Sequence, residues 1–480
     1  MALVACAVLI AIPFLWVRFP PITDLPQYLA QVRLLHETIA DPEGPYRVQW
    51  LTPYLLAYVP LTVAWHVSPS EIAGRTAMLI LALLWIVSIH WLAFKRGRSA
   101  AAAVLASLLF YNHTVYWGFY SFAIGWPVYV LWFLLTTRAP ASSRRPKEVL
   151  LSLGAAWLLY LSHALWLVVG VAWFALRTAV ARTPARTVVL RLAAVSPVLV
   201  MAAVWYHGFS GFSSSTHWVT PSSGRLSFSW IVDSTLGGLR GPAEYGLAGL
   251  LALWVILGVY QNRGRLSAAV DRDLCLAAAF FFGLALVLPD KHQNTIAFAA
   301  RWQPMAAIML LLGLPAPAWP RRVGQAVALT TAAVFMLVTS LAWVRFERYE
   351  SNGLRESLDA LPANMRVIGL DYVKTSSIVK GRPFLQQFAY AQVVRGGQLN
   401  FSFAEFAPMA VVYKAPRARP WTRGLEWYAE RASRSDLSHF DYALVNGEAR
   451  QHALLGGLAE LTPVTGPSRW RLYRINTISR

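Results

Sequence analysis

Residues 1–40 read MALVACAVLIAIPFLWVRFPPITDLPQYLAQVRLLHETIA, and this stretch decides the fold. Residues 1–17 are apolar, and we interpret them as a first membrane-spanning helix rather than a signal peptide, because they lack a basic leading segment and a small-residue cleavage site. Asp24 follows, between prolines that restrict the backbone. Apolar residues then recur at helical spacing and predict an amphipathic helix: Leu25, Tyr28, Leu29, Val32, Leu35 and Ile39.

The composition of the chain is that of a membrane protein with a water-facing end. Of the 480 residues, 56% are hydrophobic and 14% charged, whereas soluble domains carry about 25% charged residues. Residues 1–345 hold 11 of the 23 acids, and residues 346–480 hold the other 12. We expect a polytopic α-helical membrane domain over 1–345 and an extracytoplasmic α/β domain over 346–480. The excess of Arg, Ala, Leu and Val is typical of a GC-rich bacterium, so we expect the inner membrane.

Apolar runs predict about eleven membrane-spanning helices, several of them shorter than the roughly 20 residues of a straight span. The runs lie at about 1–17, 72–94, 99–112, 118–137, 148–162, 164–177, 189–207, 246–262, 272–289, 305–319 and 325–345. Short loops between alternate runs hold 16 Lys or Arg, namely loops 95–98, 138–147, 177–191, 263–272 and 321–322. Basic loops face the cytoplasm, which places the N-terminus inside and the C-terminal domain outside.

Residues 51–68 form a further apolar segment whose interpretation affects the orientation. If this segment spanned the membrane, the later Arg-rich loops would lie outside, against the positive-inside rule. We therefore expect a helix on the outer leaflet, broken at Pro53 and Pro60. The first outer loop is then long, over about 18–71. The net charge of +20 reflects the basic membrane loops, so we expect membrane lipid and no nucleic acid as a partner.

Ionisable residues gather at the outer ends of the predicted spans. They are one acid, three histidines and two cations: Asp24, His113, His163, Lys291, His292 and Arg301. Such groups are costly near membrane depth and are therefore functional candidates. Structural interpretations also exist. Asp24 would cap a helix with Gln27 in a capping box, the histidines would be turn residues, and Lys291 and Arg301 would contact lipid headgroups.

Several motifs for other chemistries are absent from the sequence. It has no P-loop, no GxGxxG after a strand, no HExxH and no Cys/His metal spacing. We therefore expect no cofactor, and the sequence does not support a divalent metal. Cys6 and Cys275 lie in apolar runs and indicate no disulfide framework.

Three features resemble the GT-C superfamily of membrane glycosyltransferases, which use sugars carried on polyprenyl phosphates. The first is the acid after the first span, in the segment TDLPQYLA at 23–30. The second is the set of short helices with polar turns at 111–118 and 161–163. The third is the final segment SRWRLYR at 468–474, which is similar to the closing strand of many such bacterial proteins. The resemblance covers the architecture of the whole chain.

The resemblance implies that Asp24 is a general base on an extracytoplasmic acceptor, which would be a lipid, a glycan or a protein. Cations would then stabilise the departing lipid phosphate, and we assign this to Arg301 and Lys291, assisted by His113 or His163. Many family members carry a second acid close to the first. Here the next acids are only Glu37, Asp41 and Glu43.

The C-terminal 135 residues are expected to form strands at 365–370, 442–445 and 468–475, and a helix at 384–394 ending at Gly396-Gly397. This part would cover the site, help to bind the acceptor, or act only as a stabilising module. The alternative functions are a lipid-linked oligosaccharide transporter and an inactive envelope-assembly scaffold with a GT-C-like fold. Because the span interiors are mostly apolar and the polar groups lie at their outer ends, we favour the transferase.

Overall fold

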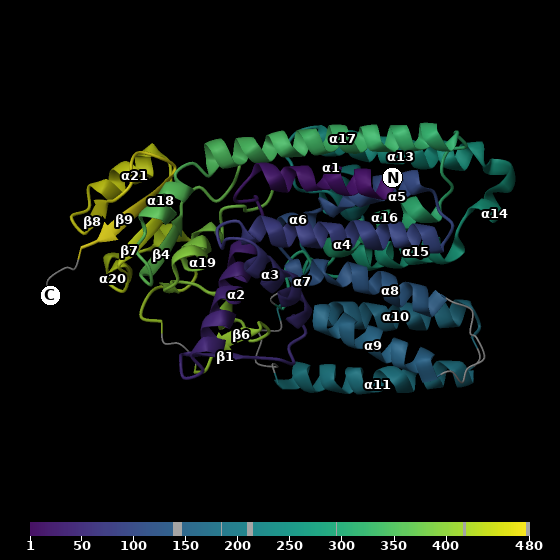
Figure 1. The fold of residues 1–480 in the computed structure, drawn as a ribbon, viewed down its shortest axis with the longest axis horizontal. Helices are drawn as coiled ribbons and strands as arrows, with labels where there is room; N and C mark the ends of the chain where they lie inside the picture. Colours follow the sequence, from purple (N-terminus) through teal and green to yellow (C-terminus); the bar gives the residue numbers. More distant parts are fainter. Residues whose placement is uncertain (138–145, 184, 209–214, 294, 416–418, 477–480) are drawn as a thin grey trace.

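Each predicted apolar run coincides with a helix in the computed structural model, which describes residues 1–137, 146–183, 185–208, 215–293, 295–415 and 419–476 (Figure 1). The main helices are α1 (Ala2–Trp16), α4 (Ala73–Lys95), α5 (Ala100–Ser107), α8 (Gly125–Thr137), α9 (Pro146–Ser162), α10 (Ala164–Val180), α11 (Ala185–Gly208), α13 (Ala243–Gln261), α15 (Arg272–Val287), α16 (Gln303–Gly313) and α17 (Arg321–Arg345). They lie roughly side by side in a long bundle.

Five helices of the described chain are long and apolar enough to cross a membrane, by length and composition. They cover Ala73–Lys95, Tyr120–Thr137, Val188–Gly208, Ala243–Gln261 and Arg321–Glu350. The chain is therefore a polytopic helical membrane protein. Other apolar helices are shorter, and the number of eleven spans stays a prediction.

The long first loop contains two helices, α2 (Leu25–Ala40) and α3 (Leu55–Val67). Helix α2 begins where the periodicity predicted it. Its polar residues Gln27 and Gln31 are fully buried, however, so its polar side faces other protein rather than water. Pro60 lies inside α3, and the prediction that this proline breaks the segment is wrong.

Short elements connect the long helices. They are η1 (Leu108–Phe110), α6 (His113–Tyr116), α7 (Tyr120–Ala123), β2 (Thr216–His217), η2 (Gly224–Leu226), α12 (Phe228–Thr235), β3 (Lys291–His292) and η4 (Ala300–Trp302). Two others, η3 (Arg263–Arg265) and α14 (Leu266–Ala269), follow α13. Strands β2 and β3 pair in antiparallel fashion. Arg225, fully buried, joins this region by donating to the carbonyl oxygens of Ala285 and Leu288 and to the carboxylate of Asp290.

The C-terminal part, at one end of the bundle in Figure 1, contains a five-stranded sheet in the order β5-β4-β7-β9-β8. Its strands are β4 (Arg366–Asp371), β5 (Gln398–Leu399), β7 (Tyr442–Asn446), β8 (Leu461–Pro463) and β9 (Trp470–Ile475). Strands β4 and β7 are parallel, and β9 is antiparallel to β7. The helices of this part are α18 (Leu354–Ala360), α19 (Tyr390–Arg395), α20 (Arg434–Leu437) and α21 (Ala449–Gly456).

The three predicted strands are confirmed within a few residues, and the predicted helix is shorter than expected. It consists of the turn η6 (Gln387–Ala389) and α19, and ends at Gly396 as predicted. The residues from Phe384 to Gln386 are not helical, and two of them line a cavity described below.

The C-terminal part is joined to the long first loop by backbone and side-chain contacts. Strand β1 (Tyr46–Val48) pairs with β6 (Val411–Tyr413), although more than 360 positions separate them in the sequence. Gln31 donates to the carbonyl oxygen of Val411 and accepts from its backbone N–H. Helix α2 therefore lies between the bundle and the C-terminal part, where its buried amides are hydrogen-bonded.

Candidate functional site

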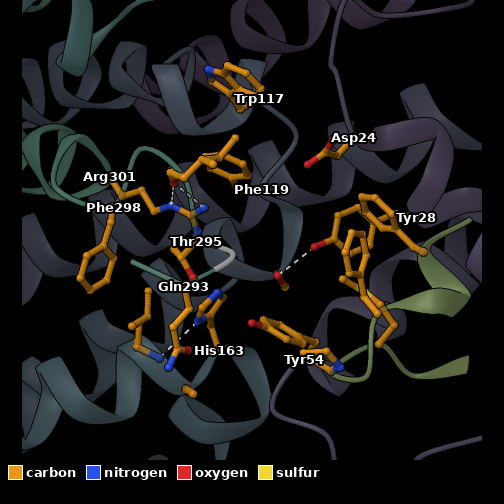
Figure 2. Close-up of a pocket in the computed structure, with 18 of the residues that line it drawn as sticks. Asp24, Tyr28, Tyr54, Trp117, Phe119, His163, Gln293, Thr295, Phe298 and Arg301 are labelled. Carbon is orange, nitrogen blue, oxygen red and sulfur yellow. Dashed lines mark hydrogen bonds between the residues drawn. The ribbon is translucent and has the colours of Figure 1, made fainter. Parts of the chain in front are cut away.

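A cavity of about 650 Å³ lies where the first loop, the polar turns of the bundle and the C-terminal part meet (Figure 2). Aromatic and apolar side chains form most of its wall, including Trp117, Phe119, Phe298, Phe403 and Trp427. A small number of polar groups face it: Asp24, Tyr28, Tyr54, Ser121, His163, His292, Gln293, Arg301 and Gln386. A mostly apolar pocket with a few convergent polar groups is the usual form of a small-molecule site.

The backbone at Asp24 is held by the turn that follows α6. The N–H of Thr23 donates to the carbonyl oxygen of Tyr116 at 3.0 Å, and the N–H of Asp24 donates to that of Trp117 at 3.1 Å. Gly118 packs against the same peptide, with φ of +77°. A Cβ at position 118 would lie 2.6 Å from the Asp24 nitrogen, so only glycine allows this approach.

The Asp24 side chain faces the cavity and does not cap α2. Although Asp24 is the N-cap residue, its carboxylate accepts no capping hydrogen bond. Gln27, the expected partner in a capping box, instead donates to the side-chain oxygen of Gln386 at 2.9 Å. The capping-box interpretation is therefore wrong. Burial raises the pKa of Asp24 to about 8, and the positive charge of Arg301 opposes this rise.

Arg301 is a buried cation whose charge has no carboxylate partner at ion-pair distance among the described residues. Only 5% of its surface is exposed. Its guanidinium lies 3.7 Å from the centre of the Phe119 ring and donates to the carbonyl oxygen of Ile296 through Nε at 3.2 Å and Nη2 at 2.9 Å. Burial lowers the pKa of Arg301 to about 10, opposed by Tyr54, Tyr28 and Asp24, so the group stays charged at neutral pH. The free edge of the guanidinium is available to an anion.

The structure brings four of the six candidate residues to this cavity, namely Asp24, His163, His292 and Arg301. His292 is held by a 3.0 Å hydrogen bond between its Nδ1 and the hydroxyl of Thr216. His113 and Lys291 do not line the cavity. His113 lies beside Trp117 with its ring centre 6.3 Å from the indole, and Lys291 pairs with His217 in the short β2–β3 ladder.

Many members of the family that the sequence resembles carry a second acid close to the first, but the next acids of this chain do not line the cavity. Glu37 pairs with Arg33 on the exposed side of α2 at 2.7 Å, and Asp41 and Glu43 are exposed at its end. Within the described part of the chain, no three acidic, histidine or cysteine side chains are grouped to hold a metal ion. Two cavity residues not singled out from the sequence are Tyr54 and Gln386. Their neighbours are distant in sequence, so no local pattern indicates them.

No protein-family model matches the sequence, and no curated protein matches it. Two solved structures are similar in fold. The first is ArnT from Cupriavidus metallidurans in the apo state, with a TM-score of 0.53 and 13% identity, covering 98% of this chain and 97% of that one. The second is ArnT of the same organism bound to undecaprenyl phosphate, with a TM-score of 0.50 and 13% identity over 99% and 98% of the two chains. The chain therefore shares its fold with these ArnT structures over nearly its whole length.

Proposed function

We propose that this protein transfers a sugar from a polyprenyl-phosphate donor to an acceptor on the extracytoplasmic side of the membrane. The observation that carries the proposal is that the carboxyl group of Asp24 and the guanidinium of Arg301, neither of which has an ion-pair partner among the described residues, face one cavity. The fold likeness to an ArnT structure bound to undecaprenyl phosphate supports a lipid phosphate as the anion.

The proposed reaction needs one base and one anion-stabilising group. A hydroxyl or amine of the acceptor attacks the anomeric carbon of the sugar while Asp24 accepts its proton. The bond between that carbon and the phosphate oxygen breaks, and the lipid phosphate leaves with the electron pair. Arg301 stabilises the negative charge that grows on the phosphate. A pKa of about 8 makes Asp24 a stronger base than an ordinary carboxylate.

The orientation of the chain is part of the proposal. An acceptor outside the cytoplasm requires the Asp24 loop and the C-terminal part to lie there, with the N-terminus inside, as the basic loops indicate. Single cysteines at exposed positions Gly97 and Ser435, introduced into a variant whose native Cys6 and Cys275 are replaced by Ser, would test this orientation. A membrane-impermeant maleimide added to intact cells should label the cysteine at 435 and spare the cysteine at 97. The reverse pattern would contradict the proposed orientation.

Transfer is tested with purified protein, radiolabelled polyprenyl-phosphate sugars and extracted envelope acceptors. We expect transfer by the parent protein, and a loss of about 100-fold or more in Asp24→Asn and Arg301→Gln. The matched control is Glu37→Gln, which neutralises an acid of the same loop outside the cavity and should keep the parent rate. Absence of transfer by the folded parent across all donors would overturn the proposal.

A further inference from the structure

Two hydrogen-bond donors, Tyr54 and His163, face the cavity beside Arg301. Figure 2 shows Tyr54 and His163 pointing toward one another, with Arg301 above them and Asp24 across the open space. The Tyr54 and His163 rings meet edge to face, with centres 4.7 Å apart and an interplanar angle of 83°. The Phe122 ring supports His163 from a second direction, at 5.8 Å.

The protonation of His163 is fixed by its position before α10. It is the N-cap residue of this helix, and its Nδ1 accepts a hydrogen bond from the backbone N–H of Leu165 at 3.2 Å. A nitrogen that accepts carries no proton, so the ring proton lies on Nε2, which can then only donate. The ring is 5% exposed, and burial together with the charge of Arg301 lowers its pKa, so the imidazole is neutral.

Nε2 of His163 and the hydroxyl of Tyr54 have no hydrogen-bond partner in the described part of the chain, although both residues line the cavity. Arg301 is close enough to act electrostatically on both side chains. One fixed cation and two neutral donors therefore lie on the same side of the cavity. The carboxylate of Asp24 lies on another side. Donors that converge without an acceptor between them form a site for an anion.

We propose that Tyr54 and His163 complete, with Arg301, a cradle for the phosphoryl group of the lipid, in which Tyr54 and His163 are neutral donors. This inference rests on the proposed function and specifies its phosphate site. A sugar linked to a lipid phosphate is a diester with one negative charge, and the phosphate left after transfer carries about 1.5 to 2 charges near pH 7. Neutral donors bind the added charge without repelling Arg301 in the empty site.

Two substitutions at position 163 test separately the two roles of the His163 ring, which are donation into the cavity by Nε2 and capping of α10 by Nδ1. In His163→Asn, the side-chain oxygen can still accept from the N–H of Leu165, but no donor reaches the position of Nε2. In His163→Gln, the amide nitrogen reaches that position, while the cap is lost. Tyr54→Phe removes only the hydroxyl. The matched control is Tyr260→Phe, which removes a hydroxyl from an exposed tyrosine outside the cavity.

The first readout is binding of undecaprenyl phosphate to the full-length protein in lipid nanodiscs, with undecaprenol as the uncharged comparison. We expect His163→Asn and Tyr54→Phe each to weaken phosphate binding about 10-fold, with His163→Gln within about 3-fold of the parent. Binding of undecaprenol should be the same in all variants. Melting temperatures should show the opposite order, with His163→Gln below His163→Asn.

The outcomes distinguish this inference from the proposed function. If the parent binds the phosphate lipid no better than the alcohol, a lipid phosphate is not the ligand and both proposals fail. If the parent prefers the phosphate and Asp24→Asn abolishes transfer, the proposed function stands. Unchanged phosphate binding in His163→Asn and Tyr54→Phe would then overturn the cradle alone. Equal loss in His163→Asn and His163→Gln would likewise overturn it, because a donor at the Nε2 position would not matter.

Discussion

Replacing Asp24 by Asn should remove transfer and stabilise the protein at the same time. The carboxylate has no capping hydrogen bond and no ion-pair partner within the described residues, and burial raises its pKa from the ordinary 3.8 to about 8. The folded protein therefore binds a proton that the unfolded chain has released at neutral pH. A raised carboxyl pKa makes the folded state lose stability as the pH rises from about 4 to about 8.

The size of the effect follows from the same shift. At pH 7 the proton must be bound about three pH units above the ordinary pKa, and one unit corresponds to about 1.4 kcal/mol, which gives a ceiling of roughly 4 kcal/mol. Asp24 keeps partial exposure to the cavity, so screening by solvent reduces this value, and we expect about 1–2 kcal/mol. Asn carries no charge and avoids the cost, so the difference between variant and parent should grow between pH 4 and pH 8 and then level off.

The assay compares thermal unfolding of the parent and Asp24→Asn, followed by tryptophan fluorescence at pH 5, 7 and 9 with one scan rate. Membrane proteins often unfold irreversibly, so both proteins must be compared under the same kinetic conditions. The variant should melt higher than the parent at pH 7 and 9, with a smaller difference at pH 5. A variant that melts lower at pH 9 would show that the carboxylate stabilises the fold, which refutes the assignment of a free base.

Three further predictions concern Gly118, Arg301 and Lys380. Gly118→Ala should reduce transfer at least 10-fold and destabilise by about 1–3 kcal/mol, because a Cβ there would strike the Asp24 peptide; paired activity and melting measurements check this. Arg301→Lys should keep the charge but lose the stacked, two-point geometry and slow transfer about 10-fold or more, seen in kcat/KM. Lys380→Met should lower stability by about 3–5 kcal/mol, because it leaves Glu244, 1% exposed, without its counter-charge.

Each of these predictions has a result that contradicts it. Normal transfer in Gly118→Ala would mean that the turn does not position Asp24. Full activity in Arg301→Lys would reduce the role of the guanidinium to charge alone. For Lys380→Met, the double variant Lys380→Met, Glu244→Gln should regain stability, and failure to do so would show that charge pairing is not the cause.

The sequence predicts the helical body well because the pattern that encodes it is local. A run such as 72–94 is mostly apolar, and a helix is the structure that satisfies its backbone without water. Asp24 is also found locally, since it is the acid that follows the first span. The polar residues Gln27 and Gln31 predict a face of α2 that is not covered by protein, and this prediction is misleading. Their hydrogen-bond partners Gln386 and Val411 lie more than 350 positions away in the sequence, so no local pattern shows that the face is buried. The sequence pattern of a polar helix face is the same whether water or protein covers that face.

The polar turns show a second limit of prediction from sequence. His113 and His163 both follow apolar runs and look equivalent in the sequence, yet only His163 lines the cavity. Their difference lies in how α6 and α10 are placed around the cavity, which depends on packing of the whole bundle. Tyr54 lies in the segment whose membrane position the sequence left ambiguous, so its hydroxyl could not be assigned to a site.

The pairing of β1 with β6, described above, has a consequence for biosynthesis. The first loop leaves the ribosome early, but the wall that closes the cavity beside it is supplied by residues as late as Trp427. The first loop therefore waits for most of the translation time before the cavity is complete, and even the last helix of the bundle, which ends at Arg345, is made before this wall. A chain truncated before β6 would have its membrane helices but not a complete cavity. The order of synthesis therefore delays formation of the site until nearly the whole polypeptide has been made.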